Sequence, residues 1–549
     1  MSVITVNRKL LEKVAGKKLS EEFLQQKVSM MGAVLEKISP EEIEAEVFPS
    51  RPDLISEQGF ARAFSSFIGA QMGLKQYPVL KSGNKVVGAK SLPAQWPYVV
   101  ACIVKGLKFN DQRIKEVIQI QEKLGLTVLR QRKKGGLGLY PLEKITFPVS
   151  FEGRKPEEIK FQPLEFPNVI TGRQILSQHP TGRAYANICQ DWDKFPVFVD
   201  AKGIIMSMPP IINSHNVGKI TESTTDVFIE ATGTDLNAIN LCLVILATSL
   251  ADMGGTIYSL EVTQKDGRKS NIPDLTPQTM KLDLGYINKR LGLELKEKEV
   301  KFFLEKMGMG CEKGMVSIPA YRADVLHQAD LAEDVAIAYG YENFPEVIPN
   351  VCTIGQEDPL EKFSRQTREI LVGVGLLEVK NLHLMTEVEL NQKMGLQNKL
   401  VGLKNALGEY NTLRNSLLTS MMKNFSENQH NEYPQNIFEI GRVFDFGQTE
   451  TGIVEKEHLG VMLCHDQVDF TRVKQVLDIL MKSMGLEVKI KDAKHASFIL
   501  GRVGEIMVQG KKLGVIGEIH PQVLENWNLA VPVVGMELDL EELWKLVLK

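Results

Sequence analysis

The chain has 549 residues, of which 43% are hydrophobic and 24% charged, and its formal net charge at pH 7 is −3. This is the composition of an ordinary globular protein, and at roughly 100–200 residues per domain the length predicts three or four domains. The small net charge excludes a global basic field, so any contact with RNA must come from local patches or from a partner.

Six cysteines are spread along the chain, with no C-x-x-C pair among them. This spacing argues against structural zinc and against a disulfide framework, and it is typical of a reducing cytoplasm. The N-terminus has no apolar run of the signal-peptide type. The longest apolar run, 241–250, is interrupted by polar residues and is shorter than the about 20 residues that span a bilayer. We therefore expect a cytoplasmic protein without membrane contact.

The first region alternates strand and helix patterns. We predict a strand at 2–6, helices at 8–14 and 19–31, a strand at 44–48 and a helix at 56–74. Ser20, followed by two glutamates, is typical of a helix N-cap. The polar, glycine-containing stretch 81–90 predicts a linker, which would end a first domain.

The second region begins with a predicted strand at 99–104 and a helix at 111–124, and it ends in a long apolar helix at 236–253 before Gly254-Gly255. The basic cluster Arg130 to Lys134 is typical either of a phosphate-binding patch or of a solvated strand end. The glycines that follow lack G-x-x-x-x-G-K-[ST] and are not a phosphate loop.

Polar residues in the second half of this region are candidates for hydrolytic chemistry. Glu230 lies on a predicted strand among apolar neighbours, where burial would require either a salt bridge or a polar site. His215 is either a general base or a surface histidine of the polar loop that contains it. The full candidate set is Asn213, Ser214, His215, Glu230, Thr232, Thr234 and Asp235.

A third region contains a cluster of acids. Asp330, Glu333 and Asp334 are spaced i, i+3, i+4, so a helix would place three carboxylates on one face, with Asp324 just upstream. Oxygen ligands without His or Cys suit Mg²⁺. The alternative is that the acids favour a helix N-terminus through its dipole. His327 has no second histidine at i+4, which argues against zinc.

These stretches resemble one family along nearly the whole chain. The motifs are "PSRPD" after an early strand, "MPPIIN" and "VFIEATGTD" in the second region, "RADVLHQADLAEDVA" with "YGY" in the third, and "TLRNSLL", "IFEIGRVF" and "GEIHP" near the end. All are similar to the phenylalanyl-tRNA synthetase beta subunit of the archaeal and eukaryotic type.

The resemblance implies an α+β, multidomain fold with an editing domain, a small metal-binding α/β domain, and a degenerate class II synthetase-like antiparallel sheet domain. We expect the domains at 1–85, 86–270, 271–350 and 351–549.

The resemblance also implies roles and partners. The chain would form a heterotetramer, two alpha and two beta subunits, that attaches phenylalanine to tRNA(Phe) with ATP. It would contribute assembly, tRNA docking and hydrolysis of tyrosyl-tRNA(Phe). Asn213, Glu230, Thr234 and Asp235 would form the editing pocket. Asp324, Asp330, Glu333 and Asp334 would bind Mg²⁺ at the contact with the alpha subunit.

The last region departs from an active class II core. Such a core needs cations at the ATP phosphates. Arg414 is followed by Asn415-Ser416 rather than by an acid at the second position, and 514–520 contains no arginine. We expect an inactive core that pairs with an active partner. The alternatives are a stand-alone RNA-binding or trans-editing scaffold, and a metal-dependent phosphohydrolase that uses the acidic cluster.

Overall fold

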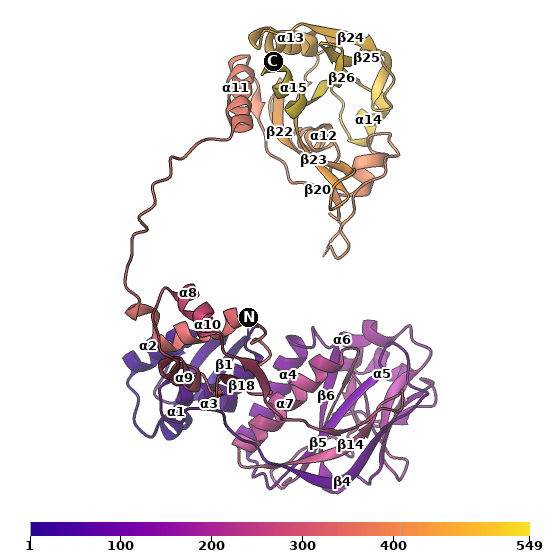
Figure 1. The fold of residues 1–549 in the computed structure, drawn as a ribbon. Helices are drawn as coiled ribbons and strands as arrows, with labels where there is room; N and C mark the ends of the chain where they lie inside the picture. The colour runs from indigo at the N-terminus through magenta and orange to yellow at the C-terminus, as the bar shows by residue number, and fades with distance from the viewer. Residues whose placement is uncertain (1, 407, 549) are drawn as a thin grey trace. The chain divides into compact units, whose positions relative to one another are not determined.

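The computed structural model describes residues 2–406 and 408–548. The chain divides into two compact units, Met1–Ile348 and Pro349–Lys549, each with its own hydrophobic cores. Helices and strands are interspersed in both units (Figure 1). The expectation of a mixed α+β, multidomain protein is confirmed.

The first unit begins with a three-stranded antiparallel sheet in the order β1-β3-β2. Alternate residues such as Ile4, Val6 and Ile43 are buried, because successive strand side chains point to opposite faces. The apolar sides of three helices pack into the same core. The elements are β1 (Ser2–Asn7), α1 (Arg8–Ala15), α2 (Glu21–Met30), β2 (Val34–Ile38), β3 (Glu42–Val47), η1 (Pro52–Leu54) and α3 (Glu57–Phe67).

Helix ends in this part follow local signals. Ser20 caps α2, accepting a hydrogen bond from the Phe23 N–H at 3.2 Å, as the sequence predicts. Helix α3 is shorter than expected and ends at Phe67, because Gly69 adopts a left-handed conformation with φ of 82°.

A ten-stranded sheet in the order β12-β11-β10-β7-β4-β14-β5-β13-β6, with β15 on β14, forms the largest part of the unit. Helix α7 packs on β5 and β13, and α4 lies beside it against β6 (Figure 1). The elements are β4 (Val79–Gly88), β5 (Tyr98–Lys105), α4 (Asp111–Leu126), β6 (Gly135–Pro141), β7 (Val149–Arg154), β8 (Lys160–Phe161), β9 (Ile170–Thr171), α5 (Gly172–Gln178), α6 (Pro180–Cys189), β10 (Phe195–Val199), β11 (Ile205–Met208), β12 (Ile212–Asn213), β13 (Val227–Gly233), α7 (Leu236–Asp252), β14 (Thr256–Thr263) and β15 (Lys269–Ile272).

The predicted linker at 81–90 is wrong. Most of it is strand β4, which pairs in parallel with both β14 and β7 inside the large sheet. The polar residues and Gly83 of this stretch suggested a loop. In the structure Gly83 has a φ of 75° and lies where the register between β4 and β14 shifts, next to Ser259. The expected boundary at 85/86 therefore falls within a strand.

The third part of the unit is a small sheet in the order β16-β18-β17 with three helices. It packs on α3, where the Ser66 hydroxyl donates to the Glu305 carbonyl at 3.0 Å, and Met307 and Ala338 join the core of the first sheet. The segments expected as separate domains at 1–85 and 271–350 thus share a core. The elements are β16 (Gln278–Lys281), α8 (Leu284–Leu291), α9 (Glu297–Lys306), β17 (Gly310–Glu312), β18 (Met315–Ile318) and α10 (Gln328–Tyr339).

The second unit is a seven-stranded sheet in the order β19-β22-β23-β27-β26-β25-β24, antiparallel except for the β19–β22 pair. Both faces are covered: α11, α13 and α15 share one core, and α12 and α14 share the other. The elements are α11 (Pro359–Gly373), β19 (Leu377–Glu378), β20 (Leu384–Met385), β21 (Thr412–Leu413), α12 (Leu417–Glu427), β22 (Gln435–Phe446), β23 (Ile453–Cys464), α13 (Phe470–Ser483), β24 (Val488–Asp492), β25 (Phe498–Val508), β26 (Lys511–Ile519), α14 (Pro521–Asn526), β27 (Val533–Asp539) and α15 (Leu540–Val547).

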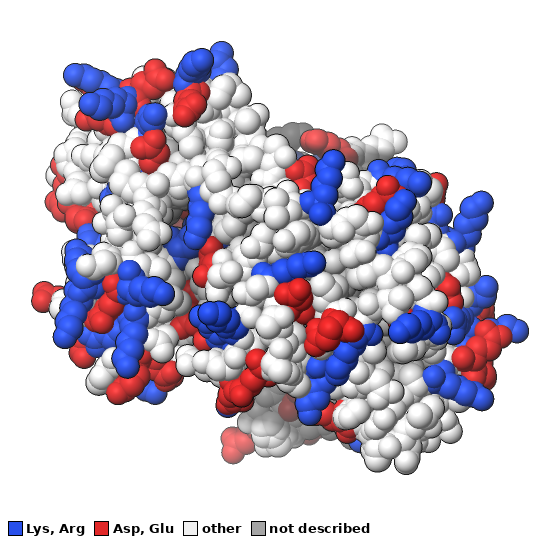
Figure 2. All heavy atoms as spheres, turned by 90° about the horizontal axis from the view of Figure 1, so that it is seen from below, with Lys and Arg blue, Asp and Glu red and all other residues white. Residues whose placement is uncertain are grey.

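The surface carries charges of both signs. On the face seen in Figure 2, lysine and arginine side chains are interspersed with aspartate and glutamate, without a wide field of one sign. None of the helices in the described ranges combines the length and apolar character that a membrane crossing requires.

Candidate functional site

A cavity of about 480 Å³ lies between α4 and the strands β6 and β13. Its walls are largely apolar, with Leu137 and Leu139 on β6 and Val117 and Ile118 on α4. A few polar side chains are placed among them, which is the usual composition of a small-molecule site. The polar members of the lining include Arg132, His179, Asn213 and Glu230.

A tyrosine that the sequence did not indicate joins two of the predicted residues. The Tyr140 hydroxyl lies 3.2 Å from Asn213 Oδ1 and 3.1 Å from Glu230 Oε1. A hydroxyl has a single proton to donate, so the two contacts are satisfied together when the Glu230 carboxyl is itself protonated. Gly138, opposite Glu230 in β6, is required here because a Cβ would collide with both Glu230 and Tyr140.

Glu230 is a buried carboxylic acid. Its residue is 2% exposed, and burial raises its pKa to about 8, with the Tyr140 hydrogen bond opposing the shift. Its Oε2 atom is buried and has no hydrogen-bond partner among the described residues. The Thr232 hydroxyl, two residues along the same strand, is in the same state. Of these two residues only Glu230 lines the cavity, where its carboxyl could exchange a hydrogen bond with a polar ligand atom.

Thr234 and Asp235 are placed elsewhere, at the corner between β13 and α7. Asp235 Oδ1 accepts the Ala238 N–H at 3.1 Å as the N-cap of α7, and Oδ2 pairs with Lys134 Nζ at 2.9 Å. The Thr234 N–H donates to the Lys134 carbonyl at 2.9 Å. The structure thus brings Asn213 and Glu230 together and gives Thr234 and Asp235 contacts that stabilise a corner.

One member of the basic cluster, Arg132, is used internally, whereas Arg130 and Lys133 are exposed. Arg132 donates from Nη1 to the carbonyl oxygens of Pro210 and Ile211, each at 3.1 Å, and its guanidinium lies 4.4 Å from the Tyr185 ring centroid. It thereby holds the turn that leads into Asn213. His215 does not line the cavity, and its N–H donates to the Gln162 carbonyl at 2.8 Å.

The predicted magnesium ligands have separate partners in this chain. Asp330 Oδ2 accepts the N–H groups of Leu326 and His327, both at 2.7 Å, and so caps α10. Asp324 and Asp334 both bind Arg322, at 2.6 and 2.8 Å from Nη2. Burial raises the pKa of Asp334, and Arg322 opposes that shift.

These four carboxylates do not fit a magnesium ion as one ligand set. Glu333 is exposed and Asp330 keeps Oδ1 free, whereas Asp324 and Asp334 are neutralised by a buried arginine. Within residues 2–406 and 408–548, no group of three or more His, Cys, Asp or Glu side chains is arranged to hold a metal.

The second unit contains a closed polar centre rather than an open phosphate site. Arg414 and Glu439 form an ion pair at 2.8 Å with both side chains 0% exposed. Arg414 also donates to the Arg442 carbonyl at 2.9 Å, and Glu439 accepts from the Asn381 amide at 2.7 Å. A guanidinium held in this way is not available to ATP.

Known proteins match the chain over most of its length. The phenylalanine–tRNA ligase beta subunit of Pyrococcus abyssi is 40% identical over 503 residues, covering 90% of each chain. That of Archaeoglobus fulgidus is 36% identical over 549 residues, covering 98% of each. The chain belongs to the phenylalanine–tRNA ligase beta subunit family.

Two family models and a solved structure locate parts of this beta subunit. The tRNA synthetase B5 domain matches residues 280–341, and the phenylalanyl-tRNA synthetase beta chain CLM domain matches 344–540. The crystal structure of an N-terminal fragment of the Pyrococcus horikoshii beta subunit is similar with a TM-score of 0.59 and 35% identity, covering 62% of this chain and 99% of the fragment. The resemblance seen in the sequence is thereby confirmed, and a beta subunit implies an alpha-subunit partner.

Proposed function

We propose that this beta subunit hydrolyses tyrosine from mischarged tRNA(Phe), and that the 480 Å³ cavity is the hydrolytic site. Tyrosine exceeds phenylalanine by one hydroxyl, and an apolar pocket rejects such an addition only by about 10². A ligase that activates phenylalanine therefore benefits from a second pocket that selects the wrong product. The observation that carries this proposal is the buried Glu230 carboxyl, which lies beside Tyr140 and Asn213 on the wall of the cavity and has no cation paired with it among the described residues.

The preference for tyrosine over phenylalanine would follow from an unsatisfied hydrogen-bonding group on the wall of the cavity. A phenolic oxygen that enters the cavity can exchange hydrogen bonds with the Glu230 carboxyl, whose Oε2 atom has no partner among the described residues. A phenylalanine side chain would leave this carboxyl unpaired, and sites of this kind discriminate by roughly 10⁴–10⁵. Asn213 at the edge would have its amide N–H groups available for the ester or for a water.

A deacylation assay with matched variants tests the proposal. Glu230→Ala in the assembled ligase should leave phenylalanine charging unchanged and slow release of tyrosine from tyrosyl-tRNA(Phe) by at least about tenfold, the effect of one lost hydrogen bond to a charged or buried group. Glu143→Ala, an exposed glutamate, is the control. Tyrosyl-tRNA(Phe) hydrolysed at the wild-type rate by the Glu230 variant would contradict the assignment.

We also propose that the chain pairs with alpha as part of an assembly of two alpha and two beta subunits, in which alpha uses ATP and Mg²⁺ to charge tRNA(Phe). The closed Arg414–Glu439 centre supports a scaffolding role for residues 349–549. Asp330 and Glu333 retain free carboxylate oxygens and are the members of the acidic set best placed for a divalent ion shared with alpha. Asp324 and Asp334 would first have to exchange Arg322 for that ion.

A further inference from the structure

A second cavity, of about 180 Å³, lies between α3 and the segment that leads into α10. The loop from Gln71 to Lys75 and the turn at Met307-Gly308 complete its wall. At roughly 30 Å³ per water, this volume corresponds to a few water molecules. It can hold a small ion, but it is too small for a nucleoside.

Among the charged side chains in the wall of this cavity, cations outnumber acids. The charged side chains that line it are Arg51, Arg62, Lys75, Arg322 and a single acid, Asp53. They come from η1, α3, the following loop and the segment before α10, so the cavity joins parts of the chain that are far apart in sequence. Three arginines around one small space are a recurrent means of binding oxyanions.

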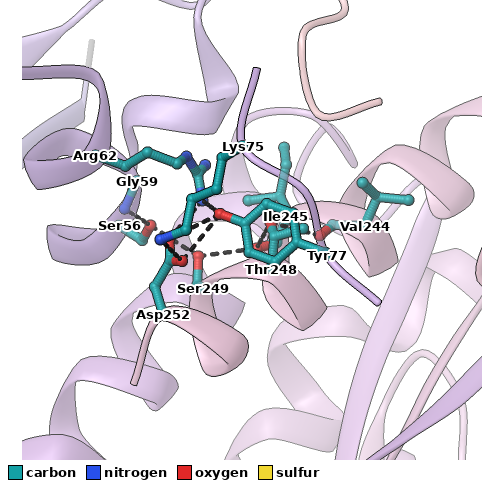
Figure 3. A network of polar contacts seen from close by, with 10 residues as sticks. All are labelled: Ser56, Gly59, Arg62, Lys75, Tyr77, Val244, Ile245, Thr248, Ser249 and Asp252. Atoms are coloured by element: carbon teal, nitrogen blue, oxygen red, sulfur yellow. Dashed lines mark hydrogen bonds and ion pairs between the residues drawn. The ribbon is translucent and has the colours of Figure 1, made fainter. Parts of the chain in front are cut away.

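The acid that pairs with two of these cations lies outside the wall. Asp252, at the end of α7, accepts from Arg62 Nη1 at 2.6 Å and from Lys75 Nζ at 2.7 Å, and the Tyr77 hydroxyl donates to it at 2.9 Å (Figure 3). Asp252 is not among the residues that line the cavity. Asp252 therefore fixes the positions of both cations, while Arg62 and Lys75 themselves line the space.

Arg322 is held in a similar way. Its Nε and Nη2 groups donate to Asp324, and Nη2 also reaches Asp334. Neither acid lines the cavity. With Asp53 on Arg51, the cluster contains four cations and four carboxylates, so its formal net charge is zero and an anion would be held by individual N–H groups.

One donor in this cluster has no acceptor. The Arg62 guanidinium lies 3.9 Å from the Tyr321 ring centroid and donates from Nη1 to Tyr77 and Asp252. Its Nη2 atom is buried, and no hydrogen-bond partner for it exists in the described parts of the chain. A buried guanidinium N–H beside a cavity indicates an acceptor that the protein itself does not supply.

We propose that this cavity binds a small tetrahedral oxyanion: the phosphate ion, or the phosphate group of a small monoester. The ligand would accept from Arg62 and Lys75 on one side and from Arg51 and Arg322 on the other. Since these residues come from separate segments, the bound anion also stabilises the packing of α3 against the segment before α10.

Calorimetry on the full-length chain tests the site with inorganic phosphate and with methyl phosphate, each compared with chloride at equal ionic strength. We expect one phosphate site per chain. Lys75→Met, at a side chain that is 44% exposed, should weaken binding by about tenfold, the loss of one charge-assisted hydrogen bond. Binding of both phosphates supports a monoester as ligand, and binding of phosphate alone supports the free ion.

The control is Lys85→Met, which removes the same charge from a lysine paired with Glu261 outside the cavity. It should bind phosphate like the unmodified chain. Arg62→Met combined with Asp252→Asn removes the donor without stranding its carboxylate, and it should abolish binding while the chain stays folded by circular dichroism. Phosphate that binds no better than chloride, or equally well to all variants, would overturn the proposal.

Discussion

At the scale of single residues, Glu230 determines the character of the larger cavity. A carboxyl that is buried without a cation remains protonated near neutral pH, because desolvation disfavours the charged form. Its pKa moves from the ordinary 4.5 to about 8. The same residue is therefore a neutral hydrogen-bonding group for a ligand and a cost to stability once the unfolded chain can ionise it.

The sign of that cost gives a prediction. Between pH 5 and pH 8 the folded state holds a proton on Glu230 that the unfolded state has released, so the free energy of opening falls as pH rises. Glu230→Gln should remove this dependence. We expect the variant to gain up to about 1.4 kcal/mol per pH unit over the wild type in that window. Hydrogen exchange of the β13 peptide, followed by mass spectrometry, measures it.

Glu143→Gln is the matched control, since Glu143 is exposed and should show the wild-type pH dependence. A Glu230→Gln variant whose advantage is the same at pH 5 and pH 8 would show that Glu230 is ionised in the folded protein. The hydroxyl-selecting role proposed for it would then need a different donor.

At the scale of elements, the residues at the corner between β13 and α7 stabilise the fold, whereas Glu230 on β13 lines the cavity. Asp235 and Thr234 follow Glu230 closely in sequence, and polarity alone does not distinguish the three. In the fold, Asp235 satisfies the first turn of α7 and pairs with Lys134. Those bonds also lower the pKa of its carboxyl, with the Lys134 hydrogen bond as the largest cause.

Two substitutions at this corner distinguish a cap from a catalytic group. Asp235→Ala should destabilise α7 by about 1 kcal/mol, the usual effect of removing an N-cap. Asp235→Asn keeps an accepting oxygen and loses only a partly exposed ion pair, so it should cost less than about 1 kcal/mol. Urea unfolding of the full chain measures both. The rate at which Asp235→Asn deacylates tyrosyl-tRNA(Phe) should stay within about twofold of the wild-type rate. Loss of this activity would show that Asp235 takes part in catalysis.

At the scale of the whole molecule, the acidic stretch divides into a folding part and an exposed part. Asp324 and Asp334 bind a buried arginine, Arg322, which also donates to the Met307 carbonyl at 3.4 Å. Asp330 and Glu333 lie on α10, and within residues 2–406 and 408–548 neither Asp330 Oδ1 nor the Glu333 carboxylate takes part in a hydrogen bond. A single substitution in this stretch can therefore affect assembly or folding, depending on the residue.

We predict opposite outcomes for the two parts. Asp330→Asn with Glu333→Gln should weaken the alpha–beta assembly in magnesium. Since asparagine keeps an accepting oxygen for the N–H groups at the start of α10, the double change should cost this chain less than about 1 kcal/mol. Asp334→Ala should lower stability on the order of 3 kcal/mol, because it leaves Arg322 with less compensation in a buried position. Sedimentation at micromolar concentration and thermal unfolding measure the two effects.

Glu294→Gln with Glu297→Gln makes the same change of charge at exposed positions of the same module and is the control. If sedimentation shows the same alpha–beta affinity for both double variants, with and without magnesium, a divalent ion at Asp330 and Glu333 does not contribute to assembly. The proposed hydrolytic site would not be affected by that result.

Local patterns in the sequence determined the elements and the family. The spacing of apolar residues and the N-cap at Ser20 define α2, α4 and α7 to within a few residues, because helix periodicity and capping are properties of neighbouring residues. Glu230 was identifiable because an acid on an apolar strand requires a special environment.

Only the tertiary structure decided how distant residues combine. The Tyr140 hydroxyl contacts Asn213, 73 residues away in the sequence, and Glu230, 90 residues away. Arg132 contacts the Pro210 carbonyl, 78 residues away, and so holds the turn before Asn213. Strand β4 was mistaken for a linker because its stability comes from β14 and β7 and not from its own residues. Two of the predicted metal ligands, Asp324 and Asp334, form ion pairs with Arg322. The sequence did not indicate these pairs, because the pairing of buried charges depends on which segments pack together.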